Sequence, residues 1–169
     1  MSWLSDKIYN LADSREFRDF IDFFKLDFLC YQERLILYND CFYVELYLEH
    51  HFPFMDFFHY KENKWAEVNR FFVDEKIDYN SLMETVRSRD YVDYIENLEA
   101  LKRIYYYFEA VRRFHPDLFN CKIEAKYADL FDSFDPQHWG FDKILSRIRT
   151  QENLKMASGQ IRRWFGRQE

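Results

Sequence analysis

The first 139 residues of this chain contain no glycine, so every tight turn before Gly140 has to be made by residues that carry a side chain. Aromatic residues make up 21% of the sequence, and their rings bury large apolar areas when they pack. The chain therefore has the material for a rigid, well-filled core. It lacks the glycine patterns with which a backbone approaches phosphate groups, which argues against nucleotide-dependent chemistry of the known loop types.

The charge is unevenly distributed along the chain. Residues 137–169 contain seven basic and three acidic residues, whereas residues 1–136 contain 17 basic and 27 acidic residues. The length suits one domain over residues 1–169, since domains typically have about 100–150 residues. We therefore expect a single domain with an acidic body and a basic helical segment, residues 137–169, that is docked on the body or extends from it.

Two features bear on the compartment. The first residues lack the basic and apolar pattern of a signal peptide, and no stretch reaches the roughly 20 apolar residues of a transmembrane helix. The three cysteines, Cys30, Cys41 and Cys121, are widely spaced and form no CxxC motif. We therefore expect reduced cysteines in a cytoplasmic protein, and a Cys30–Cys41 disulfide is the less favoured alternative.

Most of the chain shows the apolar periodicity of amphipathic helices. The clearest segments are residues 14–28 and the stretch from Asp90 to Pro116, in which acids come first and bases last, as the helix dipole favours. Further helices are predicted over residues 63–72, 123–134, 141–148 and 154–165, with Gly159 a weak point in the last.

The periodicity changes between residues 31 and 60. Apolar and polar residues alternate from Phe42 to Glu49, as in a half-buried strand, and residues 34–38 and 54–60 are further candidate strands. Asn39 and Asp40 tolerate positive φ and predict a two-residue hairpin turn. We predict an α+β fold, mainly helical, with a small antiparallel meander near residues 31–60. An all-α bundle is the alternative, because a sequence so poor in glycine and proline also suits a helix over residues 31–49.

No set of residues forms a recognisable catalytic or metal-binding motif. His50, His51 and His59 are the best metal candidates, but their spacing matches no zinc module. The cysteines lie in apolar sequence, where a thiol is inert, and no Gly-x-Ser-x-Gly motif occurs. We therefore predict no metal, no cofactor and no enzymatic activity.

Two groups of residues are candidates for binding. Some aromatic residues fall outside the apolar stripes, and exposed aromatic side chains often mark protein interfaces. The basic C-terminal segment suits an anionic ligand. The aromatic candidates are Tyr43, Tyr47, Tyr106, Tyr107, Trp164 and Phe165, and the basic candidates are Arg147, Arg149, Arg162, Arg163 and Arg167.

These patterns favour a non-enzymatic protein-interaction module: an adaptor, an inhibitor, an immunity-like or antitoxin-like binder, or a self-associating subunit. The alternative is a nucleic-acid-associated protein that binds through the basic segment, although the acidic body would repel phosphates. A small enzyme or a metal site around His50, His51 and His59 is the third hypothesis.

Overall fold

The structure is a computed structural model that describes residues 11, 14–49, 52–73, 76–82, 98–135 and 140–166. For residues 98–101 and 159–166 it describes the backbone only. The chain divides into two compact units, Met1–Phe134 and Asp135–Glu169. The first unit contains a sheet and its helices, and the second contains the helix α5.

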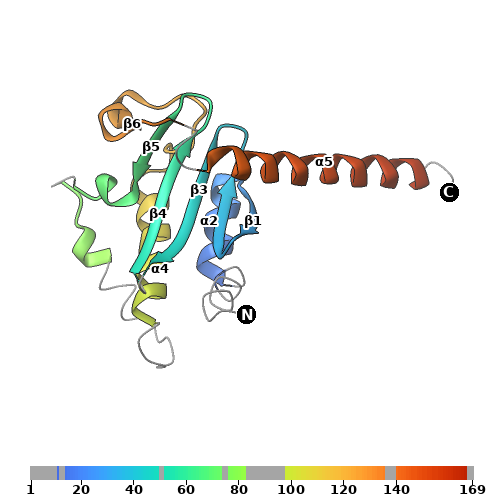
Figure 1. The fold of residues 1–169 in the computed structure, drawn as a ribbon. Coiled ribbons are helices and arrows are strands. Elements are labelled where there is room, and N and C mark those ends of the chain that lie inside the picture. Colours follow the sequence, from blue (N-terminus) through green and yellow to red (C-terminus); the bar gives the residue numbers. More distant parts are fainter. Residues whose placement is uncertain are drawn as a thin grey trace. The chain divides into compact units, whose positions relative to one another are not determined.

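The first unit is built on a six-stranded antiparallel sheet whose strands follow chain order from β1 to β6 (Figure 1). The prediction of a mainly helical fold with a small meander was therefore wrong, and so was the all-α alternative. The three predicted strands are present, and three more extend the sheet. The strands are β1 (Asp27–Tyr31), β2 (Arg34–Tyr38), β3 (Phe42–Glu49), β4 (Phe52–His59), β5 (Lys64–Glu67) and β6 (Asp132–Ser133).

The predicted helix over residues 14–28 is shorter than expected. The helix α2 (Arg15–Phe24) is capped by Ser14, whose Oγ accepts a hydrogen bond from the Phe17 amide at 3.2 Å. It ends at Lys25, which adopts a left-handed conformation with φ of 54°. Phe28 consequently lies in β1, and its ring still packs against Phe17 at 5.2 Å.

The hairpin between β1 and β2 is made without glycine. Gln32 and Glu33 both have positive φ, 46° and 61°, and join β1 to β2 in a two-residue turn. The turn predicted at Asn39 and Asp40 is present but longer, because the last paired residues of β2 and β3 are Tyr38 and Tyr43. There the Asn39 side chain accepts hydrogen bonds from the next amides, those of Cys41 and Phe42.

Two predicted helices are replaced by strands and 3-10 turns. Residues 63–72 form β5 and the 3-10 helix η1 (Val68–Phe71), and residues 123–134 form the 3-10 helix η2 (Ala125–Leu130) and β6. Nearly half of the residues in this chain are apolar. At that density a spacing of three or four residues arises in strands and turns as well, so periodicity alone misassigns short segments.

The core lies between the sheet and two helices, α2 and α4 (Leu98–Phe114), which cover the same face (Figure 1). Phe108 of α4 is buried, and its ring contacts those of Phe20 and Phe17, at 4.6 and 6.1 Å. All four residues from Tyr105 to Phe108 are buried. Helix α4 is therefore covered on more than one side, and it ends before Pro116 as predicted.

The loop after α4 is fastened to the sheet. Cys41 and Cys121 form a disulfide, so the expectation of reduced cysteines was wrong for this pair, and the disulfide excludes the alternative Cys30–Cys41 pairing. The Asn39 side-chain amide donates to the carbonyl of Phe119 at 3.2 Å, and His59 Nε2 lies 2.7 Å from the carbonyl oxygen of Cys121. Three attachments thus hold this loop to the turn between β2 and β3 and to the end of β4.

The second unit contains one continuous helix, α5 (Phe141–Gly166). The sequence predicted two helical segments, residues 141–148 and 154–165, with Gly159 as a weak point in the second, but the backbone is helical throughout. A single glycine costs a helix only about 1 kcal/mol relative to alanine, which does not force a break. Among the helices of the described residues, none is long and apolar enough to cross a membrane.

Candidate functional site

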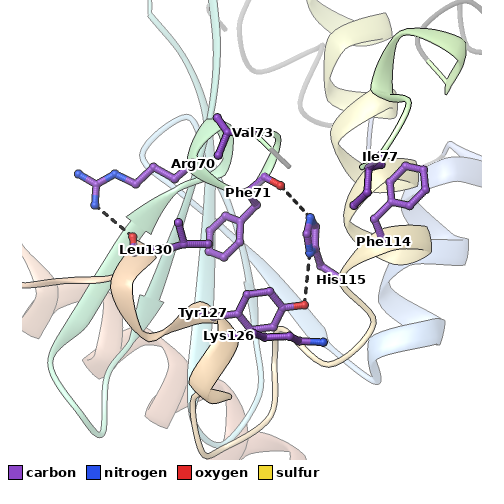
Figure 2. Close-up of a pocket in the computed structure, with 9 residues that line it drawn as sticks. All are labelled: Arg70, Phe71, Val73, Ile77, Phe114, His115, Lys126, Tyr127 and Leu130. Carbon is purple, nitrogen blue, oxygen red and sulfur yellow. Dashed lines mark hydrogen bonds between the residues drawn. The ribbon is translucent and has the colours of Figure 1, made fainter. Parts of the chain in front are cut away.

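A cleft of about 330 Å³ opens in the first unit between η1, the end of α4 and η2 (Figure 2). Its floor is formed by Phe71, His115 and Tyr127, which are all buried. Val73, just after η1, is 71% exposed, which leaves a large apolar side chain at the cleft in contact with water. The remaining lining residues are Arg70, Ile77, Phe114, Lys126 and Leu130.

His115 lies at the centre of a hydrogen-bond network. Its Nε2 lies 2.8 Å from the carbonyl oxygen of Phe71 and therefore carries the proton, because a carbonyl can only accept. Its Nδ1 lies 3.3 Å from the Tyr127 hydroxyl (Figure 2). The Tyr79 hydroxyl donates to the same Phe71 carbonyl at 2.8 Å. Both ring nitrogens of His115 thus face groups of the protein itself.

The network continues from Tyr127 to a charged pair. The Tyr127 hydroxyl donates to Asp117 Oδ1 at 2.6 Å, and Lys126 Nζ lies 2.5 Å from Asp117 Oδ2. Burial and the hydrogen bond to Asp117 raise the pKa of Tyr127, so the phenol keeps its proton. Burial raises the pKa of Asp117, but hydrogen bonds from Lys126 and Tyr127 outweigh it, and the pKa is lowered overall. Asp117 is therefore an anion that fixes the Tyr127 ring.

Arg70 connects the two sides of the cleft. Its guanidinium donates to the carbonyl of Leu130 at 3.1 Å and pairs with Asp132 at 2.6 Å. It also lies over the Trp65 ring, 5.7 Å from the centroid. The hydrogen bond from Arg70 lowers the pKa of Asp132. Arg70 and Lys126 are thus cations held at defined positions beside an apolar opening.

The geometry of the cleft allows a ligand to bind. The His115 ring is held in place, because its Nε2 donates to the Phe71 carbonyl and its Nδ1 lies beside the Tyr127 hydroxyl, which donates its proton to Asp117. The apolar walls, by contrast, are partly open to water. The cleft can therefore take up an apolar group and place polar atoms near Arg70 or Lys126.

A second group of titratable residues lies in the sheet, on the face opposite α2 and α4. The register pairs Glu45 with Asp56 and Asp56 with Glu67, so three carboxylates form a row across β3, β4 and β5. Arg34 pairs with Glu45, and the Tyr47 hydroxyl donates to Asp56 at 3.1 Å. Burial raises the pKa of Glu45 above its usual value. Burial, aided by the neighbouring acids, raises the pKa of Asp56 to about 6 although Tyr47 opposes it.

We expect Asp56→Asn to stabilise the protein at neutral and alkaline pH. The raised pKa means that the folded state binds the Asp56 proton more tightly than the unfolded state does. The free energy of unfolding therefore falls as the pH rises from about 4 to 6, by up to about 3 kcal/mol, and stays low above that range. The substitution removes this loss, so urea unfolding at pH 8 should show a gain of about 1–3 kcal/mol.

The same measurement at pH 4 should show no gain, because Asp56 is already neutral there in the folded protein. Asp129→Asn, at an exposed position, is the matched control and should change the free energy of unfolding little at either pH. An equal gain at both pH values, or none at pH 8, would contradict the raised pKa.

Three of the tyrosines predicted to lie outside the core are buried. Tyr106 and Tyr107 pack on Phe72, with ring centroids at 5.4 and 5.8 Å. Tyr43 stacks on Phe58 at 4.7 Å. The prediction of their exposure was wrong, because it assumed that each element has one covered face. A partner could contact these three rings only after they were exposed.

The other predicted binding residues have diverse positions. Tyr47 is half-buried, stacks on Phe54 at 5.1 Å and has the Arg34 guanidinium above its ring. Arg147 and Arg149 are exposed on α5. Four candidates lie in the part of α5 for which only the backbone is described: Arg162, Arg163, Trp164 and Phe165. Arg167 lies outside the described residues. Their role in binding stays a prediction.

Of the three candidate metal-binding histidines, the structure describes only His59. His59 is fully buried; its Nδ1 accepts from the Glu62 amide at 3.1 Å, and its Nε2 faces the Cys121 carbonyl. His50 and His51 lie outside the described residues. Within the part of the chain that the structure describes, no three His, Cys, Asp or Glu residues gather closely enough to hold a metal ion.

The cleft itself was not predicted from the sequence. Phe71, Tyr127 and Leu130 fall within the predicted helices 63–72 and 123–134, which the structure replaces with strands and 3-10 turns. The sequence held one signal for His115, since this residue follows a long helix directly and a helix end exposes unpaired carbonyl groups.

No protein-family model matches the sequence, no curated protein is detectably similar to it, and no solved structure matches its fold.

Proposed function

We propose that this chain is a protein-interaction module in which the cleft beside His115 receives one apolar side chain of a partner protein. The observation that carries the proposal is Val73, which is 71% exposed at an apolar cleft whose floor is fixed by hydrogen bonds. Anchor side chains that fill preformed pockets supply much of the binding energy of protein interfaces. A pocket held by the His115 and Asp117 network is preformed in this sense.

The cations define the chemistry expected around the anchor. Arg70 and Lys126 line the cleft, and both are held in place by carboxylates, Asp132 and Asp117. A partner with an acidic residue near its anchor would gain a favourable interaction at close range. Such charge complementarity mainly increases specificity and the association rate. The favoured partner is thus a protein segment with one large apolar residue and a nearby carboxylate.

The compartment of this interaction is a separate matter. The sequence predicted a cytoplasmic protein with reduced cysteines. The Cys41–Cys121 disulfide points to an oxidising environment, because cytosolic thiols are kept reduced. The interaction is therefore proposed without the cytoplasmic location.

We expect peptides selected on the immobilised full-length chain from a phage-displayed library to share a Leu, Phe or Met anchor. By calorimetry they should bind Val73→Asp at least about tenfold more weakly, a difference of about 1.4 kcal/mol. The reason is that a carboxylate at the cleft would have to be desolvated against the apolar anchor.

Phe23→Asp is the matched control, since Phe23 is another exposed apolar residue, on α2 and outside the cleft. Peptide binding should survive this substitution. Failure to enrich any common anchor, or peptides that bind both variants equally well, would contradict the proposal. Circular dichroism of both variants would establish that their folds are intact.

A further inference from the structure

The helix α5 carries two apolar stripes that lie on different sides. Successive residues of an α-helix are rotated by about 100°, so positions in its backbone follow directly from the sequence. Phe141, Ile144, Leu145 and Ile148 form a stripe along the first part of α5. Leu154, Ala157, Ile161, Trp164 and Phe165 occupy positions roughly 160° away from the first stripe along the second part.

A single continuous helix cannot turn both stripes towards one surface. The first stripe is already covered, because Phe141, Ile144 and Ile148 are all buried. The side chains from Asn153 to Ser158 are all exposed, and Leu154 is 65% exposed. A helix segment in water on every side gains nothing from tertiary packing, which normally supplies most helical stability in proteins. The second stripe therefore has to pack against a different surface from the one that buries the first stripe.

We propose that the second stripe of α5 pairs with the same stripe of a second copy of this chain, with the two helices antiparallel. The stripe has the three- and four-residue spacing of a coiled-coil seam at positions 154, 157, 161 and 164. An antiparallel pair centred on Gly159 places Leu154 of each copy opposite position 164 of the other. It places Ala157 opposite position 161, so that a small residue meets a large one.

The distribution of charge favours a second copy of the chain as the partner, and it favours an antiparallel pair. The positions that flank the seam include Gln151, Asn153, Ser158 and Gln160, which are uncharged, so no like charges meet beside it. In an antiparallel pair, the basic ends of the two copies, which contain Arg162 and Arg163, lie at opposite ends of the pair. A parallel pair would instead bring the two basic ends together. Four layers are few, so we expect a weak dimer with a dissociation constant on the order of 10 µM.

The chain offers a matched pair of variants to test the dimer. Leu154 and Met156 are equally exposed, 65% and 64%, but Met156 lies on the opposite side of α5. In sedimentation equilibrium of the full-length chain, the mass should rise from monomer towards dimer with increasing concentration. Leu154→Asp should weaken the association at least tenfold, and Met156→Asp should leave it unchanged.

The direction of the pair is tested by cysteine cross-linking in a Cys30→Ser background, which removes the free thiol. An oxidised mixture of Ala157→Cys and Ile161→Cys chains should form mixed covalent dimers. Ala157→Cys alone should form few, because the two 157 positions are not opposite in the antiparallel pair. Efficient cross-linking of Ala157→Cys alone would show a parallel pair and overturn the proposed direction.

A chain that stays monomeric at several hundred micromolar would overturn the dimer, as would equal weakening by Leu154→Asp and Met156→Asp. Binding to vesicles of phosphatidylserine and phosphatidylcholine tests the alternative that the second stripe contacts an anionic membrane. If the monomeric chain binds these vesicles and Leu154→Asp abolishes binding, the stripe contacts membranes and the dimer proposal is wrong. None of these results depends on the cleft beside His115, which lies in the other unit.

Discussion

Loss of the disulfide by Cys41→Ser is expected to lower the free energy of unfolding by about 4–5 kcal/mol, because the two cysteines are separated by 80 residues. A link over such a long loop removes much of the conformational entropy of the unfolded chain. Urea unfolding of the variant should show this loss. The wild-type protein should show a similar loss when a reducing agent is present.

The free cysteine provides the control for this prediction. Cys30 is exposed in β1, so Cys30→Ser should change the free energy of unfolding by less than about 0.5 kcal/mol. Reduction of the Cys41→Ser variant should have no further effect. A stability that is indifferent to both Cys41→Ser and reduction would show that the disulfide does not form in solution.

The substitution Phe108→Ala is expected to cost about 3–5 kcal/mol, because it would leave a cavity where α2, α4 and the sheet meet. Phe108 is buried, and its ring contacts Phe20 at 4.6 Å and Phe17 at 6.1 Å. Both neighbours are held in α2, so the structure can collapse only partly around the gap. Urea unfolding monitored by circular dichroism would measure the loss.

Phe23→Ala is the matched control, because Phe23 lies on α2 but is 48% exposed. Its truncation should cost less than about 1 kcal/mol. Similar losses for the two variants would contradict the placement of α4 against α2, since Phe108 would then not be at the centre of the core.

The strand that the sequence predicted most clearly is the one whose alternation is long enough to be distinctive. Phe42 to Glu49 alternates over eight residues, and only a strand places such residues on two faces. The end of α4 was predicted because Pro116 has a direct steric effect on the residue before it. In both cases the local signal does not depend on the rest of the fold.

The errors arose where tertiary context decides between two local structures. Phe28 continues the helical stripe of α2 in the sequence, but Lys25 adopts a left-handed conformation and redirects the chain into β1. Trp65 suits a helix equally well until β4 provides a partner strand for residues 64–67. Strand pairing between distant segments, such as Lys64 with Ser133, is not encoded in any local pattern.

The cleft beside His115 also depends on tertiary structure and not on a local pattern. Its residues come from three segments, and the network joins Phe71, His115 and Tyr127 across up to 56 positions of the chain. No spacing rule connects such residues before the fold is known. The acidic row from Glu45 to Glu67 is similar, because it exists only in the register of three strands.

The most direct test of the proposed cleft is a methyl NMR titration of the full-length chain with a peptide selected on it. The cleft predicts that the methyl signals of Val73, Ile77 and Leu130 shift as the peptide is added and saturate together. The signals of Val44 and Leu37, which are buried in the sheet, should stay in place. Saturable binding that leaves the signals of Val73 and Ile77 unshifted would show that the partner binds elsewhere and would contradict the proposed binding cleft.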